Sequence, residues 1–116
     1  MYQLNRGAIF VKRKQAFVDW VNKTTVADNG EELSLEAANS EPGVYMIPPF
    51  EGEKEFKDLL PQALDCIWEA ELSGWNHETS LWPKDQSSKM FYQWFSLVVS
   101  GVVYDLLEDP LEKEEV

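Results

Sequence analysis

The chain of 116 residues has a single cysteine, Cys66, and a single histidine, His77. One cysteine excludes an internal disulfide and a cysteine-rich metal centre, and it is typical of a reducing compartment. His77 has only Glu78 beside it, which does not give the spacing of a zinc site. A catalytic Cys66–His77 pair would need the two residues to meet in space, and a helical cysteine is more often a buried, unreactive thiol. We therefore expect no metal, no cofactor and no thiol catalysis.

Long apolar runs and phosphate-binding loops are also missing. No stretch approaches the ~18 apolar residues of a membrane span, and the first residues form no apolar signal region. Neither G-x-x-x-x-G-K nor G-x-G-x-x-G occurs, so nucleotide phosphates have no binding loop. These absences predict a cytoplasmic protein without a membrane partner, and they give no positive indication of an enzyme.

Basic charge is scarce and unevenly placed. The chain has 10 Lys and Arg residues against 21 Asp and Glu residues, a net charge of −11. Residues 1–27 carry five cations and one acid, a net of +4, and the rest carry five cations and twenty acids, a net of −15. Such a surface repels a phosphate backbone, so direct nucleic-acid binding is not expected, whereas a basic protein partner is favoured.

One basic run stands apart, formed by Lys12, Arg13 and Lys14. It follows an apolar segment and precedes a helical pattern, so it could bind an anion at the N-terminus of that helix. The alternative is that these cations form the solvated end of a strand.

The remaining composition is that of a globular domain, with 44% hydrophobic and 13% aromatic residues. We expect one domain over residues 1–111, followed by a frayed acidic tail, residues 112–116. Four of the five tryptophans lie between positions 68 and 94. Large rings at this density form a core or, if partly exposed, an anchor for a partner.

Periodicity predicts the first elements. Residues 7–11 are β-branched and aromatic, as in a strand, and residues 14–22 place Phe17, Trp20 and Val21 on one helical face. The Asp28-Asn29-Gly30 run predicts a break, and Ser34 predicts the cap of a single helical turn. Residues 44–47 form a second strand, which Pro48 and Pro49 end or confine to a sheet edge.

The second half contains the longest predicted helix, residues 53–73, with Gly74 as its stop. Pro61 either kinks this helix or begins a new one. Ser87 or Ser88 caps a short helix that runs to Phe95. The segment after it, residues 96–106, favours a long strand bent at Gly101 because of its valines, although a helix continuing from Ser88 stays open.

These elements predict an α+β fold, with a small, mainly antiparallel sheet of three or more strands and helices packed on one face. The two clear strands are joined by a helix and a turn, so a parallel pair through a right-handed crossover is also allowed. The strand order does not follow from the sequence.

The loop at residues 74–86 is rich in aromatic residues and is the main candidate site. With a nearby helical residue, it could form an aromatic-walled pocket or a protein-binding patch with a polar rim. Alternatively, the indoles close one end of the core. The predicted partner-binding residues are Trp75, His77, Glu78, Trp82, Asp85 and Tyr92.

Several segments resemble a family of short, acidic, uncharacterised bacterial proteins with no assigned activity. They are residues 4–7 (LNRG), 17–22 (FVDWVN), 44–48 (VYMIP), 80–83 (SLWP) and 91–95 (FYQWF). The resemblance implies a single bacterial cytoplasmic α+β domain, and it supplies no catalytic residue. It also favours a strand after Phe95.

Two functions are consistent with these observations. The first is a non-enzymatic protein-binding module whose acidic surface and aromatic loop engage a protein partner, possibly a basic one. The second is a small-ligand-binding domain or small enzyme that uses carboxylates in an aromatic pocket. A monomer and a homodimer with a free strand edge as its interface are both compatible with the sequence.

Overall fold

The computed structural model describes residues 1–25 and 30–116 and confirms the α+β fold. Its central strand, β2 (Gly7–Arg13), lies between β3 (Gly43–Ile47) and β4 (Phe95–Ser100), and both neighbours are antiparallel to it. The parallel pairing that the sequence allowed is therefore not formed by these strands. Asp28 and Asn29, which belong to the predicted break, lie outside the described residues.

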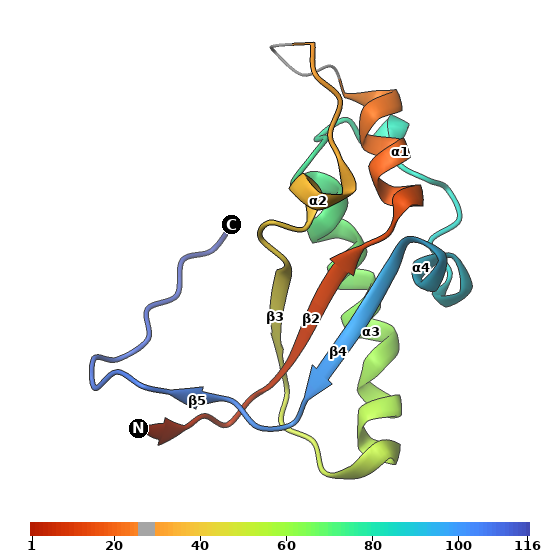
Figure 1. Cartoon of the computed structure of the whole chain (residues 1–116). Coiled ribbons are helices and arrows are strands. Elements are labelled where there is room, and N and C mark those ends of the chain that lie inside the picture. The colour runs from red at the N-terminus through yellow and green to blue at the C-terminus, as the bar shows by residue number, and fades with distance from the viewer. Residues whose placement is uncertain (26–29) are drawn as a thin grey trace.

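Strand alternation gives the three-stranded sheet two distinct faces. Ile9 and Val11 of β2 are fully buried. They face the side of the sheet on which the long helix α3 (Gly52–Ser73) lies, behind the strands in Figure 1. Phe10, between them, points to the opposite side and is exposed. We call the side facing α3 the inner face and the other side the outer face.

The short helices begin where the sequence predicted. Helix α1 (Gln15–Thr24) buries Phe17, Trp20 and Val21 on one side, as the periodicity indicated. Helix α2 (Leu35–Ala38) is one turn long, and the Ser34 hydroxyl accepts a hydrogen bond from the Ala37 N–H at 3.0 Å. Helix α4 (Ser88–Trp94) is capped in the same way by Ser87.

Helix α3 runs through Pro61 without ending. Proline removes one backbone hydrogen bond, to the carbonyl of Lys57. Because Pro61 and Lys57 are both exposed, water can bind that carbonyl and limit the cost. Of the two predicted outcomes, a second helix beginning at Pro61 is therefore not formed.

The valine-rich segment after α4 is a strand, so the helix alternative is wrong. The strand β4 ends at Ser100 rather than continuing through Gly101. A second, two-stranded sheet follows, in which β5 (Tyr104–Asp105) pairs with β1 (Tyr2–Gln3). Residues 106–116, here called the C-terminal arm, form no helix or strand; in Figure 1 they turn after β5 and run back on the β3 side of the molecule.

Aromatic rings fill the core between the inner face and the helices. Trp68 of α3 is fully buried and makes edge contacts with Phe91, Trp94 and Phe95, with ring centroids 5.3–5.6 Å apart. Its indole N–H has no hydrogen-bond acceptor. Phe17 of α1 packs against the same group. The tryptophan cluster is thus centred in the core.

Candidate functional site

The aromatic loop is attached to the core by its indoles. Trp75 and Trp82 are half-buried and pack against the core. The Trp82 indole donates a hydrogen bond to the Asn76 carbonyl at 2.8 Å, and the Trp20 indole donates to the Leu81 carbonyl at 2.9 Å. These bonds hold the loop, including its short 3₁₀ turn η1 (Thr79–Leu81), against α1. Both indoles keep part of their surface in solvent. The loop is therefore neither completely buried in the core nor free to anchor a partner with whole tryptophan side chains.

The other four predicted partner-binding residues, three on the loop and Tyr92 on α4, are exposed and do not line a common hollow. His77 and Glu78 lie on the loop surface. Hydrogen bonds from Ser87 lower the pKa of the exposed Asp85 carboxyl. Tyr92 lines a hollow beside α3, whereas Trp75 lines a different one beside α1 and α2.

The basic run is divided among different environments. Lys12 is exposed, and Lys14 donates its Nζ proton to the Tyr92 carbonyl at 2.5 Å. The Arg13 guanidinium is largely buried and engaged with a carboxylate. The three cations therefore do not form a common anion site, and the arrangement gives no support to the anion-binding prediction.

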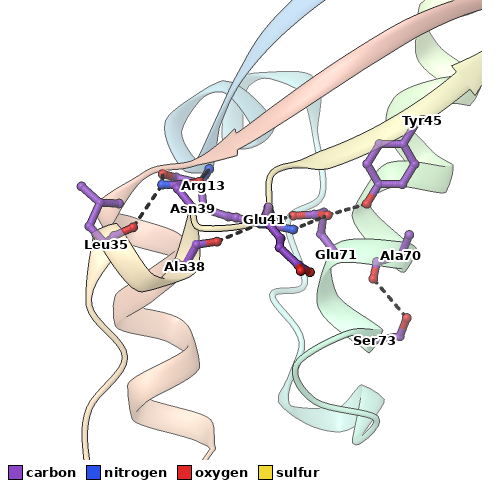
Figure 2. Close-up of polar contacts among 9 residues, drawn as sticks. All are labelled: Arg13, Leu35, Ala38, Asn39, Glu41, Tyr45, Ala70, Glu71 and Ser73. Carbon is purple, nitrogen blue, oxygen red and sulfur yellow. Dashed lines mark hydrogen bonds and ion pairs between the residues drawn. The ribbon is translucent and has the colours of Figure 1, made fainter. Parts of the chain in front are cut away.

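Arg13 belongs instead to a buried polar cluster, which we call the Arg13 clamp (Figure 2). Its Nε and Nη2 atoms donate to the two carboxylate oxygens of Glu71 at 2.6 and 3.0 Å. The Tyr45 hydroxyl donates to Glu71 Oε2 from β3. Glu71 is only 3% exposed, and among the described residues it is the one buried acid. A buried, charged carboxylate needs such partners, because an unpaired charge in the interior of a protein costs free energy.

The same clamp holds the segment around α2. Arg13 Nη1 donates to the carbonyls of Ala38 and Glu41, at 2.9 and 2.6 Å. The Asn39 side chain bonds both the N–H and the carbonyl of Arg13. Each guanidinium nitrogen is thus engaged within the chain, and the clamp joins β2, α2, β3 and α3.

Tyr45 shows the electrostatic consequence of the clamp. Burial and then the hydrogen bond to Glu71 raise the pKa of its hydroxyl well above the ordinary value of 10.0, although the nearby Arg13 opposes the shift. The phenol therefore stays protonated and donating. Because its O–H donates a hydrogen bond to Glu71, it is a structural group rather than a proton-transfer group.

A groove lies between β3 and α3 on the side of the sheet away from β4. Its volume is about 260 Å³. It is lined by Tyr45, Met46, Ile47 and Pro48 on the strand side and by Leu59, Gln62, Ala63, Cys66 and Ile67 on the helix side. Most of these groups are apolar. The expectation that Cys66 is buried is wrong, because its thiol lies on the exposed side of α3, where it lines this groove.

The strand beside this groove has a free edge. β3 is the terminal strand in the order β3-β2-β4, and no strand pairs with its outer edge in the described part of the chain. Every second residue of such a strand directs its backbone N–H and C=O away from the sheet. The free N–H and C=O groups of β3 therefore lie beside a groove with a mostly apolar lining.

Acidic side chains follow the same face of α3. Glu69 lies three positions after Cys66, and Glu55 lies four positions before Leu59, so both share the face that lines the groove. Both are exposed. Neither acid is part of the groove lining, and Glu55 also accepts a hydrogen bond from the Glu51 N–H at 2.6 Å. By their positions on the helix they add negative charge beyond the two ends of the groove, which favours a basic ligand.

No protein-family model, curated protein or solved structure matches this chain. The resemblance to acidic bacterial proteins therefore stays a prediction. Over residues 1–25 and 30–116, no group of three or more His, Cys, Asp or Glu side chains is arranged to hold a metal ion. Within the same residues, no helix has the length and apolar character that a membrane crossing requires.

The groove has only a weak sequence signal. Pro48 and Pro49 indicated an edge strand, and Leu59, Ala63 and Cys66 recur at spacings of three and four on α3. Their juxtaposition depends on tertiary packing that places β3 at the sheet edge nearest to this helix face. The Arg13 clamp had a clearer signal in the sequence. Glu71 shares the helix face of the apolar residues Leu64, Ile67, Trp68 and Leu72, and an acid on a buried face needs a charged partner.

Proposed function

We propose that this protein is a non-enzymatic protein-binding module that takes up an extended segment of a partner along the free edge of β3. The observation that carries the proposal is the apolar groove beside an unpaired strand. Binding by strand addition uses backbone hydrogen bonds for affinity and pockets for alternate side chains for specificity. The groove between Met46 on β3 and Ala63 on α3 supplies such a pocket.

The partner segment should alternate apolar and basic residues. One set of its side chains would enter the groove, and the other set would stay in solvent near Glu55 and Glu69. The net charge of −11 would attract such a segment over long range. An extended acidic segment would meet repulsion at the same place.

The alternative of a small enzyme using carboxylates finds little support. Glu71, the buried carboxylate, already accepts three hydrogen bonds from Arg13 and Tyr45. A general base needs a free lone pair directed at a substrate. We also place this activity in the reducing cytoplasm, a proposal that rests on the single exposed thiol at the groove.

Two fluorescein-labelled peptides, KVRVKVR and its acidic counterpart EVDVEVD, test this proposal by fluorescence anisotropy. We expect the basic peptide to bind, to bind more weakly as salt rises, and to shift the amide NMR signals of β3 and of α3 near Ala63. Cys66→Trp should fill the groove and weaken binding at least about tenfold. Gln93→Trp, on the exposed surface of α4, is the matched control and should leave binding unchanged.

Two results would contradict the proposal. One is equal binding of the basic and acidic peptides. The other is a set of NMR shifts confined to the loop at Trp75 and Trp82, which would assign binding to the aromatic loop instead.

A further inference from the structure

The outer face of the three-stranded sheet carries a row of exposed apolar side chains. Val44, Phe10 and Val98 stand opposite one another on β3, β2 and β4. Their exposed fractions are 54%, 40% and 60%. Met46, which is 52% exposed, extends this row along β3. Such a continuous apolar surface on a folded domain marks an interaction site.

Charge distinguishes this face from the rest of the molecule. Its other outward positions are Ala8, Lys12, Ser96 and Ser100, by strand alternation. The outer face of these strands thus has one cation and no acid, in a chain with 21 acidic residues. An acidic segment with apolar side chains can therefore approach it without local repulsion.

The C-terminal arm has the complementary character. Leu106, Leu107 and Leu111 are 74%, 67% and 59% exposed, and the acids Glu108 and Asp109 lie between them. The molecule is also expanded. Its radius of gyration is 15.8 Å, against about 13 Å for a compact domain of this length. An arm of leucines held in solvent is unfavourable unless another surface covers it.

We propose that the C-terminal arm of a second copy of this chain lies across the outer face, in a two-fold dimer that exchanges both arms. The leucines would contact the row formed by Val44, Phe10 and Val98, and the acids of the arm would lie near Lys12. A two-fold arrangement gives a closed dimer rather than a growing chain of molecules, because each copy gives one arm and receives one.

Within one chain the arm does not cover this face, because its leucines and the row formed by Val44, Phe10 and Val98 are all exposed. Pairing of β5 with β1, and the bond from the Leu4 N–H to the Val103 carbonyl at 2.8 Å, hold the beginning of the arm beside β1, outside the three-stranded sheet. The eleven residues of the arm can span about 36 Å when extended. Crossing three strands needs only about 10 Å, so the arm can reach another molecule and still cover its face.

This inference does not depend on the proposed peptide binding. The groove lies at the β3 edge beside α3 and the arm would cover the outer face, so the two surfaces meet at Met46 but share no other residue named for them. The two associations should respond oppositely to salt. Screening weakens the capture of a basic peptide, whereas it relieves repulsion between two chains of net charge −11 and should strengthen the dimer.

Mixed cross-linking tests the proposal in chains with Cys66→Ser. A tagged Val98→Cys chain is mixed with an untagged Leu107→Cys chain and oxidised with oxidised glutathione. We expect a disulfide-linked heterodimer on a non-reducing gel, because the two cysteines come from different molecules. A Gln93→Cys chain, which carries an equally exposed thiol on α4, replaces Val98→Cys as the control and should give little product.

Analytical ultracentrifugation over a dilution series gives a second test on the full chain. We expect a monomer–dimer equilibrium whose dissociation constant rises at least about a hundredfold in Phe10→Asp. Deletion of residues 106–116 should also give a monomer, and circular dichroism should show that the fold is retained in both variants. A strict monomer at all concentrations would overturn the proposal. An internal disulfide in a single Val98→Cys/Leu107→Cys chain, without mixed cross-linking, would also overturn it.

Discussion

The two faces of the three-stranded sheet differ in surroundings more than in side chains. Ile9 and Val11 are fully buried, whereas Phe10, between them on the same strand, is 40% exposed. Apolar character alone does not decide burial here, because α3 covers only one face. The inner face therefore stabilises the fold, and the outer face remains available for another chain.

The cationic residues of β2 show the same difference between the two faces. Arg13, on the inner side of β2, is bound to a carboxylate that is 3% exposed. Its neighbour Lys12 is exposed. Substitutions on the inner side should therefore lower the free energy of unfolding far more than matched substitutions on the outer side.

The largest expected effect is that of Glu71→Ala. It leaves the Arg13 guanidinium buried without its carboxylate, so the free energy of unfolding should fall by about 3–5 kcal/mol. Urea denaturation followed by circular dichroism measures the loss. Lys12→Ala on the outer face and Glu69→Ala on the exposed side of α3 are the controls, each expected within about 0.5 kcal/mol of the parent. Equal losses in all three variants would remove the contrast between the faces.

The apolar comparison comes next, on adjacent residues of β2. Ile9→Ala removes fully buried methyl groups and should cost about 2–5 kcal/mol. Phe10→Ala should cost less than about 1 kcal/mol when measured on a dilute monomer. A larger loss at Phe10 than at Ile9 would show that the outer face is covered within one chain.

The smallest expected effect concerns Tyr45. Tyr45→Phe removes one hydrogen bond to the Glu71 carboxylate and should cost about 1.5–3 kcal/mol at neutral pH. Folding raises the Tyr45 pKa above 10.0, so its stabilisation is complete below pH 10 and is lost as the pH rises beyond that value.

Tyr45→Phe should therefore have a flatter alkaline stability profile than the parent, as measured by urea titrations on either side of pH 10. Tyr104→Phe is the control, because that ring is more than half exposed. A parent profile as flat as that of Tyr45→Phe would argue against a buried tyrosine hydroxyl.

Local patterns predicted much of this fold. The 3.6-residue period predicted α1 and α3, serine caps predicted α2 and α4, and β-branched residues predicted β2, β3 and β4. The two-residue strands β1 and β5 were missed, since two residues carry no period. The strand predicted over residues 96–106 ends early, because the chain changes partner from β2 to β1 around Gly101.

The candidate site was less predictable because it depends on contacts between distant segments. Arg13 was interpreted as part of a cationic run, whereas its partner Glu71 lies 58 positions later. Cys66 was expected to be buried, yet the register of α3 turns it toward the groove. The strand edge was indicated by Pro48 and Pro49, but the helix beside it was not.

The sheet order also governs when this protein can fold during its synthesis. The central strand β2 ends at Arg13, and its neighbour β4 begins only at Phe95. A ribosome must therefore release every residue through β4 before the central strand is paired on both sides. Pairing between strands so far apart in the sequence slows folding, because the conformational entropy of the long intervening loop must be lost before the strands can pair. Until then the apolar side chains of β2 are exposed to aggregation, so nascent chains should require chaperones more than the finished protein does.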